Sequence, residues 1–279
     1  MDRRRFLRNS LSAAVAVSMP LQPLLASLRH TPTAVTSDIN ALTGDGAQLT
    51  LQKSEVQELS DELKGKLLLP GSEGYDEARL LLNPDFDKYP ALVVQPTGAA
   101  DVSAAVKFAQ DYGLLLAVKC GGHSAAGISS CDGGMQVDLS NYSSVRVDPR
   151  ARTARVAGGS LLGELDHESM AHGLVTTAGT VSHTGVGGLT LGGGFGRLAR
   201  RYGLTLDNVL EFDIVTADGQ LRRAAPDENA DLFWGLRGGG GNFGIVTSFL
   251  FRLHPMQREV VNAGFTFPLS EAKQVLNFF

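Results

Sequence analysis

Residues 179–196 read GTVSHTGVGGLTLGGGFG, and seven of the twelve residues from Gly185 to Gly196 are glycine. A backbone without Cβ atoms can turn sharply and can lie directly against a flat or charged ligand. The chain holds 33 glycines, and 20 of them fall between Gly158 and Gly244 among apolar runs. Because these glycines follow no Gly-Xaa-Yaa repeat and alternate with apolar segments, they indicate ordered loops beside a ligand and exclude a flexible linker.

Two other glycine-rich segments lie on either side of this run. The first, Lys119-Cys120-Gly121-Gly122-His123-Ser124, follows an apolar strand, and its paired glycines can turn backbone N–H groups inward to form an anion-binding nest. The second, residues 234–247, places four consecutive glycines before an apolar strand. The structural alternatives are a tight turn with a surface histidine at 119–124 and close helix packing through glycine at 179–196.

A Rossmann nicotinamide site is not favoured. Residues 185–190 match the fingerprint Gly-x-Gly-x-x-Gly only in its first two glycines, and no alternating βαβ series surrounds them.

Hydrophobic periodicity predicts an α+β fold of two subdomains that divide near residue 130. Before that point we expect a helix within 51–67, a strand at 91–94, a helix from 101 to 112 with Asp101 as its N-cap, and a strand at 114–119. Beyond it we expect strands at 135–139, 144–147 and 153–156, a helix at 161–172, a hairpin formed by 209–216 and 220–223, a helix at 227–236 and a strand at 244–253. An amphipathic helix begins at Ser270.

The pattern of the first 28 residues predicts an export signal. Arg3-Arg4-Arg5-Phe6-Leu7-Arg8 resembles the twin-arginine signal and precedes a moderately apolar stretch that ends at Leu28. A membrane anchor is the alternative, although serines and prolines interrupt the stretch. Since the twin-arginine machinery carries folded proteins, this signal predicts a cofactor-containing protein with a periplasmic or extracellular location.

Composition narrows the classes of partner. The chain has 279 residues with 43% hydrophobic and 19% charged content, and its net charge of −4 argues against nucleic acid as a partner. Cys120 and Cys131 lack the spaced ligands that a zinc site needs, so we expect no metal. In an oxidising compartment, a disulfide between these two cysteines is possible.

Four spaced motifs, at residues 121–124, 184–196, 202–209 and 231–244, together carry a family resemblance over about residues 84–258. The chain resembles the FAD-linked oxidases with a p-cresol methylhydroxylase (PCMH)-type FAD-binding domain, near the branch of berberine bridge enzyme and 6-hydroxynicotine oxidase. The resemblance implies a two-subdomain fold in which FAD lies extended between the subdomains, with its pyrophosphate on the Gly121-Gly122 turn. Residues 29–83 would precede this domain, and residues 259–279 would begin a substrate domain that is largely missing.

The same resemblance implies a set of cofactor-binding residues. His123 matches the position whose imidazole bonds covalently to the flavin 8α-methyl group. The other members of the set are Lys119, Cys120, Gly121, Gly122, Ser124, Gly179, Thr180, Val181, Thr184, Gly185, Gly187, Gly188, Gly192, Gly193, Gly194, Gly244, Ile245 and Val246. Val181 stands where doubly linked members have cysteine, so one covalent bond is expected, and Lys119 replaces an arginine that many members have.

The implied activity is oxidation of an alcohol, sugar or amine by hydride transfer to flavin N5, with electrons passed on to oxygen or another acceptor. We identify no catalytic base, because the resemblance places it in the missing domain. The alternatives are a truncated, non-catalytic FAD-binding protein and a glycine-rich structural domain without a cofactor. Among the remaining histidines, His183 could contact the cofactor, whereas His167, His172 and His254 are expected in surface or structural roles; Asp207 and Asn208 fit either capping or cofactor-side contacts.

Overall fold

A four-stranded sheet organises the first lobe of the chain in the computed structural model, which describes residues 32–278. Its strands lie in the order β3 (Lys66–Leu68), β4 (Leu92–Gln95), β6 (Met135–Asp138) and β5 (Leu116–Lys119). Strands β4, β6 and β5 are parallel, and β3 runs antiparallel to β4 at the edge. Leu92, Val93 and Val94 are fully buried, as expected for a parallel strand covered on both faces.

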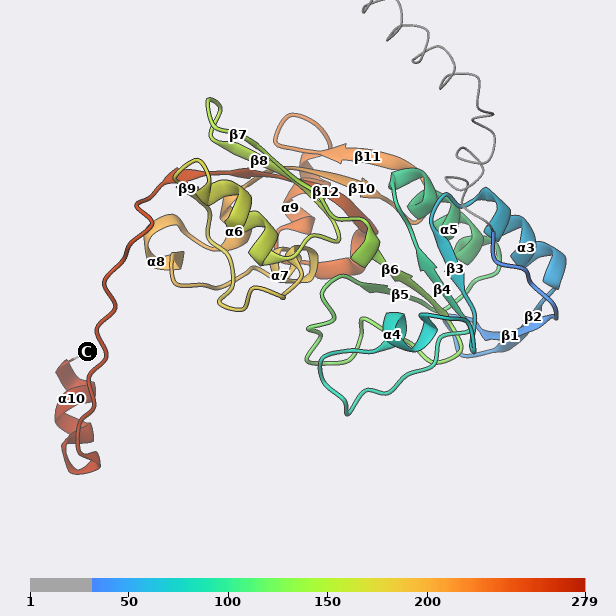
Figure 1. Cartoon of the computed structure of the whole chain (residues 1–279), viewed down its shortest axis with the longest axis horizontal. Coiled ribbons are helices and arrows are strands. Elements are labelled where there is room, and N and C mark those ends of the chain that lie inside the picture. The colour runs from blue at the N-terminus through green and yellow to red at the C-terminus, as the bar shows by residue number, and fades with distance from the viewer. Residues whose placement is uncertain (1–31, 279) are drawn as a thin grey trace, which may run out of the picture.

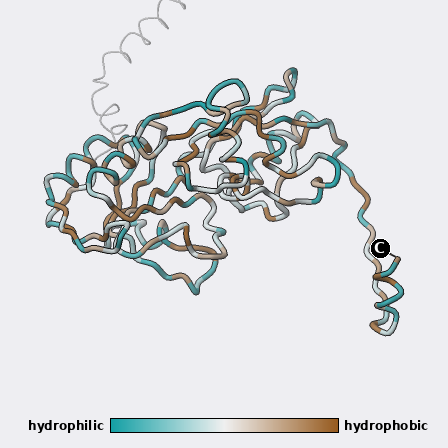
Figure 2. Tube along the Cα trace, turned by 180° about the vertical axis from the view of Figure 1, so that it is seen from behind, coloured by the Kyte–Doolittle hydropathy of each residue, from teal (hydrophilic) through white to brown (hydrophobic). Residues whose placement is uncertain are grey.

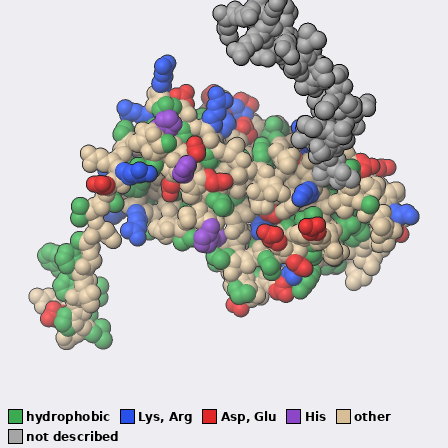
Figure 3. Space-filling view, viewed as in Figure 1, with side chains coloured by type: hydrophobic (Ala, Val, Ile, Leu, Met, Phe, Trp, Pro, Cys, Tyr) green, Lys and Arg blue, Asp and Glu red, His purple; other side chains and the backbone are tan. Residues whose placement is uncertain are grey.

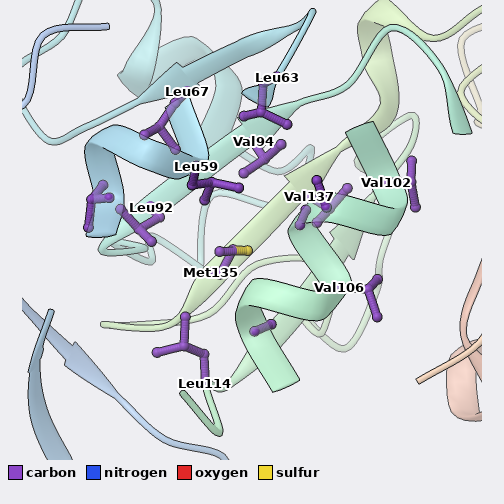
Figure 4. Packing of buried hydrophobic residues seen from close by; sticks show 14 of the residues in the cluster. Leu59, Leu63, Leu67, Leu92, Val94, Val102, Val106, Leu114, Met135 and Val137 are labelled. Atoms are coloured by element: carbon purple, nitrogen blue, oxygen red, sulfur yellow. The ribbon is translucent and has the colours of Figure 1, made fainter. Parts of the chain in front are cut away.

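Two helices and a hairpin complete this lobe's core (Figure 1). Helix α5 (Ala99–Asp111) buries a stripe of small apolar residues at helical spacing, and it packs beside α3 (Lys53–Glu62). Figure 4 shows Val102 and Val106 of α5 and Leu59 of α3 in the same apolar cluster as Val94 and Met135. The short helix α4 (Tyr75–Arg79) and the hairpin of β1 (Ile39–Leu42) and β2 (Gln48–Leu51) lie at the margins of the sheet.

Two details of this lobe differ from the sequence prediction. The predicted 51–67 helix ends at Glu62, and the chain then turns at Gly65 into β3. Asp101 is not the N-cap of α5; that position is Gly98, and Asp101 lies in the first turn. From there its carboxylate accepts the backbone N–H groups of Lys64 (2.9 Å), Gly65 (3.0 Å) and Thr97 (2.9 Å).

A five-stranded antiparallel sheet organises the second lobe. Its order is β11 (Leu221–Ala224), β10 (Val209–Val215), β12 (Ile245–Arg252), β8 (Thr153–Ala157) and β7 (Val145–Asp148). Phe212 of β10 and Phe249 and Phe251 of β12 are fully buried on one face of the sheet, where they form the core with α6 (Leu162–Met170) and α9 (Ala230–Leu236). Apolar stretches of the trace gather inside both lobes (Figure 2).

The division between the lobes lies later than predicted. Strand β6 inserts between β4 and β5, so the first lobe continues through Asp138 and not to about residue 130. All four residues of β6 are buried, which ties the strand to the parallel sheet. A 3₁₀ turn at Leu139–Asn141 then leads into the second lobe.

The glycine-rich region of the second lobe forms short elements. They are β9 (Leu174–Val175), α7 (Val186–Leu191), α8 (Ala199–Tyr202) and the 3₁₀ turns η2 (Thr205–Asn208) and η3 (Gly240–Phe243). Strand β9 pairs with β13 (His254–Pro255), which anchors the chain where it leaves the lobe.

Beyond Met256 the chain leaves the body of the molecule. Residues 257–271 are exposed, and a 3₁₀ turn at Leu269–Glu271 leads into α10 (Ala272–Phe278), which stands apart from both lobes (Figures 1 and 3). Within residues 32–278, no helix has the length and apolar character needed to cross a bilayer. The predicted export signal lies outside the described residues.

Candidate functional site

The first two glycine-rich segments cross each other at Gly121 and Gly185. A Cβ atom on Gly121 would lie 2.3 Å from the backbone nitrogen of Gly185 and 2.9 Å from the carbonyl oxygen of His183. A Cβ atom on Gly185 would in turn lie 2.4 Å from the sulfur of Cys120. Since no side chain fits at such separations, glycine at both positions is what lets the segment after β5 meet the loop before α7.

A third segment, Gly158 to Ser160, joins this crossing to strand β12. The N–H of Gly158 donates to the carbonyl of Thr247 (2.9 Å), and the N–H of Val186 donates to the carbonyl of Ser160 (2.9 Å). A Cβ atom on Gly187 would lie 3.0 Å from the Gly158 oxygen. Sequence reasoning missed this segment, although the Gly158-Gly159 pair after a strand was the available signal.

His123 and His183 meet beside the crossing. Their Nε2 and Nδ1 atoms are 2.7 Å apart, and the two rings are tilted by 45° with centroids 4.6 Å apart. The other nitrogen of His123, Nδ1, lies 3.4 Å from the Thr184 hydroxyl. Partial burial, and secondarily the neighbouring His183, lowers the pKa of His123, so its imidazole is neutral near pH 7. A neutral imidazole is a competent nucleophile.

Lys119 and Cys120 face the interior of the protein. The Lys119 ammonium group is buried, donates to the carbonyl of Ala78 (2.6 Å) and lies 3.8 Å from the Asp138 carboxylate. The sulfur of Cys120 lies 3.6 Å from the Ser160 oxygen, and burial raises the pKa of its thiol to about 11. Cys131 is likewise a buried free thiol, so the two cysteines form no disulfide in the structure.

Many of the predicted glycines serve chain packing. A Cβ atom on Gly179 would lie 2.7 Å from Leu189, one on Gly194 2.3 Å from the Thr205 hydroxyl, and one on Gly244 2.2 Å from the Val215 oxygen. Gly194 and Gly244 also have positive φ angles of 77° and 138°, which only glycine adopts readily. The alternative of close packing through glycine, expected within 179–196, therefore describes Gly179 and Gly194, and Gly244 of the third segment packs in the same way.

The other predicted residues occupy varied positions. Ile245 and Val246 are buried in β12, Thr180 and Val181 are exposed, and the Ser124 hydroxyl accepts the N–H of Ile128 (3.1 Å). Gly122 is buried and Gly193 has a positive φ of 115°, whereas Gly192 is exposed.

Four glycines of these segments, Gly188, Gly238, Gly240 and Gly241, instead offer bare backbone to open space. Nothing lies within 4 Å of a Cβ built on Gly188 in α7 or on Gly241 in η3, and these two elements pack against each other. Thr190, in the same α7 helix, has a buried hydroxyl without a partner. Open backbone on the element that begins at the glycine crossing fits a ligand with a planar ring and phosphate groups.

Asn208 holds the following loop in place. Its amide nitrogen donates to the carbonyls of Tyr202 (3.0 Å) and Leu204 (2.9 Å), and its oxygen lies 2.7 Å from His254 Nε2. The capping alternative therefore describes Asn208, and His254 has the expected structural role. Within residues 32–278, no group of three or more His, Cys, Asp or Glu side chains could hold a metal ion.

Comparison with known proteins identifies this arrangement. A family model described as an FAD-binding domain matches residues 90–225. An FAD-linked oxidoreductase of Dictyostelium discoideum is 37% identical over 222 residues, covering 79% of this chain and 48% of that protein. The (R)-6-hydroxynicotine oxidase of Paenarthrobacter nicotinovorans is 36% identical over 203 residues, covering 73% of this chain and 44% of that enzyme. The chain thus spans about half the length of the curated relatives it matches.

Solved structures agree with these sequence matches. The 6-hydroxy-D-nicotine oxidase of Arthrobacter nicotinovorans matches with a TM-score of 0.68 and 35% identity, over 69% of this chain and 43% of that one. The glucooligosaccharide oxidase of Acremonium strictum, whose structure is described with 6-S-cysteinyl, 8α-N1-histidyl FAD, matches with a TM-score of 0.69 and 35% identity, over 72% of this chain and 43% of that one. The predictions of a PCMH-type fold and of FAD as cofactor are therefore confirmed. Residues 90–225 are therefore an FAD-binding domain, and the chain is similar to FAD-linked oxidoreductases, among them 6-hydroxynicotine oxidase and the oligosaccharide oxidases.

Proposed function

We propose that this chain is the FAD-binding part of an FAD-dependent oxidoreductase that holds its flavin through a single covalent bond at His123. The observation that carries the proposal is the position of His123 beside the crossing of two glycine-rich segments, within a matched FAD-binding domain. When bound, FAD supplies a two-electron acceptor. The protein's part is to present bare backbone at Gly188 and to anchor the cofactor at His123.

The identity of residue 181 supports a single covalent bond. Val181 occupies the place that the resemblance assigns to the cysteine of doubly linked members, and valine offers no nucleophile. A covalent tether is useful in an exported protein, because no free flavin is available outside the cell to replace a lost one.

The proposed reaction is hydride transfer from an alcohol, sugar or amine to flavin N5. Two relatives are named for 6-hydroxynicotine and for glucooligosaccharides, which are small organic substrates. The acceptor of the electrons is oxygen or another small oxidant. Because the chain spans about half of these relatives, the competing proposal is a non-catalytic FAD-binding chain.

The purified 279-residue chain tests both proposals. We expect visible flavin absorbance that stays with the protein after acid precipitation, and His123→Ala should lose this acid-stable flavin while keeping its circular dichroism spectrum. A chain that remains colourless after incubation with excess FAD would contradict flavin binding. Anaerobic bleaching of the flavin by a panel of sugars, alcohols and amines would support the enzyme, and the absence of bleaching would favour the non-catalytic protein.

We also propose that residues 1–28 direct export of the folded protein by the twin-arginine machinery. The support is the run Arg3-Arg4-Arg5-Phe6-Leu7-Arg8 before an apolar stretch. Replacing Arg3, Arg4 and Arg5 with lysine should leave the protein in the cytoplasm of an expressing bacterium. Equal export of both forms would contradict this route.

A further inference from the structure

We propose that His183 takes the proton that His123 must lose when His123 bonds to the flavin. This inference rests on the covalent linkage proposed above and assigns a role to His183, which is not among the predicted cofactor-binding residues. His183 contacts His123 and acts through it, so it is a positioning and proton-accepting residue.

The contact between the two rings engages Nε2 of His123 and leaves Nδ1 without a partner in the other ring. A separation of 2.7 Å between His123 Nε2 and His183 Nδ1 requires one hydrogen between them, because two bare lone pairs would repel. When His123 Nε2–H donates and His183 Nδ1 accepts, the lone pair of a neutral imidazole is left on His123 Nδ1. The nearest partner of Nδ1, the Thr184 hydroxyl, lies at a long 3.4 Å. Nδ1 is therefore the nitrogen available for bonding.

Bond formation through Nδ1 makes the His123 ring cationic unless the Nε2 proton leaves. Partial burial already disfavours a charged His123, as its lowered pKa shows. His183 Nδ1 lies in hydrogen-bonding position to receive this proton. The His183 side chain is exposed, so its second nitrogen can pass a proton to water.

Formation of the bond between His123 and the flavin requires one two-electron oxidant. A bond forms between His123 Nδ1 and the 8α carbon, one C–H bond of the 8α methyl group breaks, and the Nε2–H proton leaves through His183. The two electrons of the broken C–H bond enter the flavin ring, and dioxygen, the two-electron acceptor named here, removes them. The two hydrogens and two electrons end as hydrogen peroxide.

The test follows covalent attachment over time in the full chain. Protein made under riboflavin limitation is mixed with FAD in air, and acid-stable flavin fluorescence is read on denaturing gels. We expect His183→Ala to bind FAD noncovalently as the wild type does. The covalent bond should then form about 100-fold more slowly, because a positioned proton acceptor usually contributes a factor of this size. Added imidazole should restore part of the rate. His167→Ala, which changes an exposed histidine on α6, should link at the wild-type rate.

A second variant separates proton transfer from hydrogen bonding. In His183→Asn the amide oxygen can accept the Nε2–H hydrogen bond but cannot take the proton, so linkage should stay as slow as in His183→Ala. Wild-type rates in either variant would overturn the proposal, as would loss of all FAD binding in both. A wild-type chain that binds FAD but never links it would refute the linkage, and one that binds no FAD would refute the proposed function itself.

Discussion

At the scale of single residues, two glycines of the candidate site have opposite surroundings. A Cβ on Gly121 would meet the Gly185 backbone at 2.3 Å, whereas one on Gly188 would meet nothing within 4 Å. We therefore expect Gly121→Ala to lower the free energy of unfolding by about 3 kcal/mol, because neither backbone can move without separating the lobes. Gly188→Ala, inside α7, should keep or raise stability by up to about 1 kcal/mol. Urea unfolding followed by circular dichroism measures both.

The same pair distinguishes a structural glycine from one that faces the cofactor. If the backbone at Gly188 lies against the flavin, Gly188→Ala should fold normally yet bind FAD more weakly. Equal stability of Gly121→Ala and the wild type would contradict the close crossing of the two segments.

At the scale of elements, one carboxylate joins the start of α5 to the start of β3. Asp101 is buried and accepts N–H groups from Lys64, Gly65 and Thr97. Asp101→Ala leaves these donors without a partner and should lower the free energy of unfolding by about 3 kcal/mol, with a smaller loss in Asp101→Asn. Asp111→Ala, at the exposed end of the same helix, should change stability by less than about 0.5 kcal/mol. Similar losses in both alanine variants would show that the buried contacts add nothing.

At the scale of the whole molecule, the buried cores of both lobes include no residue of the exposed C-terminal segment. Residues 257–271 are exposed, and α10 contains no buried residue. Deleting residues 258–279 should change the free energy of unfolding by less than about 0.5 kcal/mol. Deleting residues 253–279 also removes buried Leu253, the pairing of β13 with β9 and the His254–Asn208 contact, and should cost at least about 3 kcal/mol. Thermal unfolding of both truncated chains measures this, and a large loss in the shorter deletion would contradict it.

Much of the fold could be predicted because local patterns suffice for single elements. The apolar spacing in 101–112 predicts α5, and the two strand patterns at 209–216 and 220–223 predict the hairpin of β10 and β11. The position of β6 could not be predicted, because the residues of a short buried strand do not indicate which strands it pairs with. The prediction that Asp101 is an N-cap was wrong for a similar reason. A carboxylate near the start of a helix can also accept hydrogen bonds from a turn far away in the sequence, here the turn at Lys64 and Gly65.

The sequence by itself determined that this is an FAD-binding domain, since its glycine motifs and their order along the chain are properties of the primary structure. Only the tertiary structure decided which glycines face open space and which allow two backbones to touch. It alone also placed His183 against His123, 60 residues earlier in the chain. Such contacts depend on how the lobes pack. Packing brings together residues that are far apart in the sequence, and their separation along the chain does not predict their distance in space.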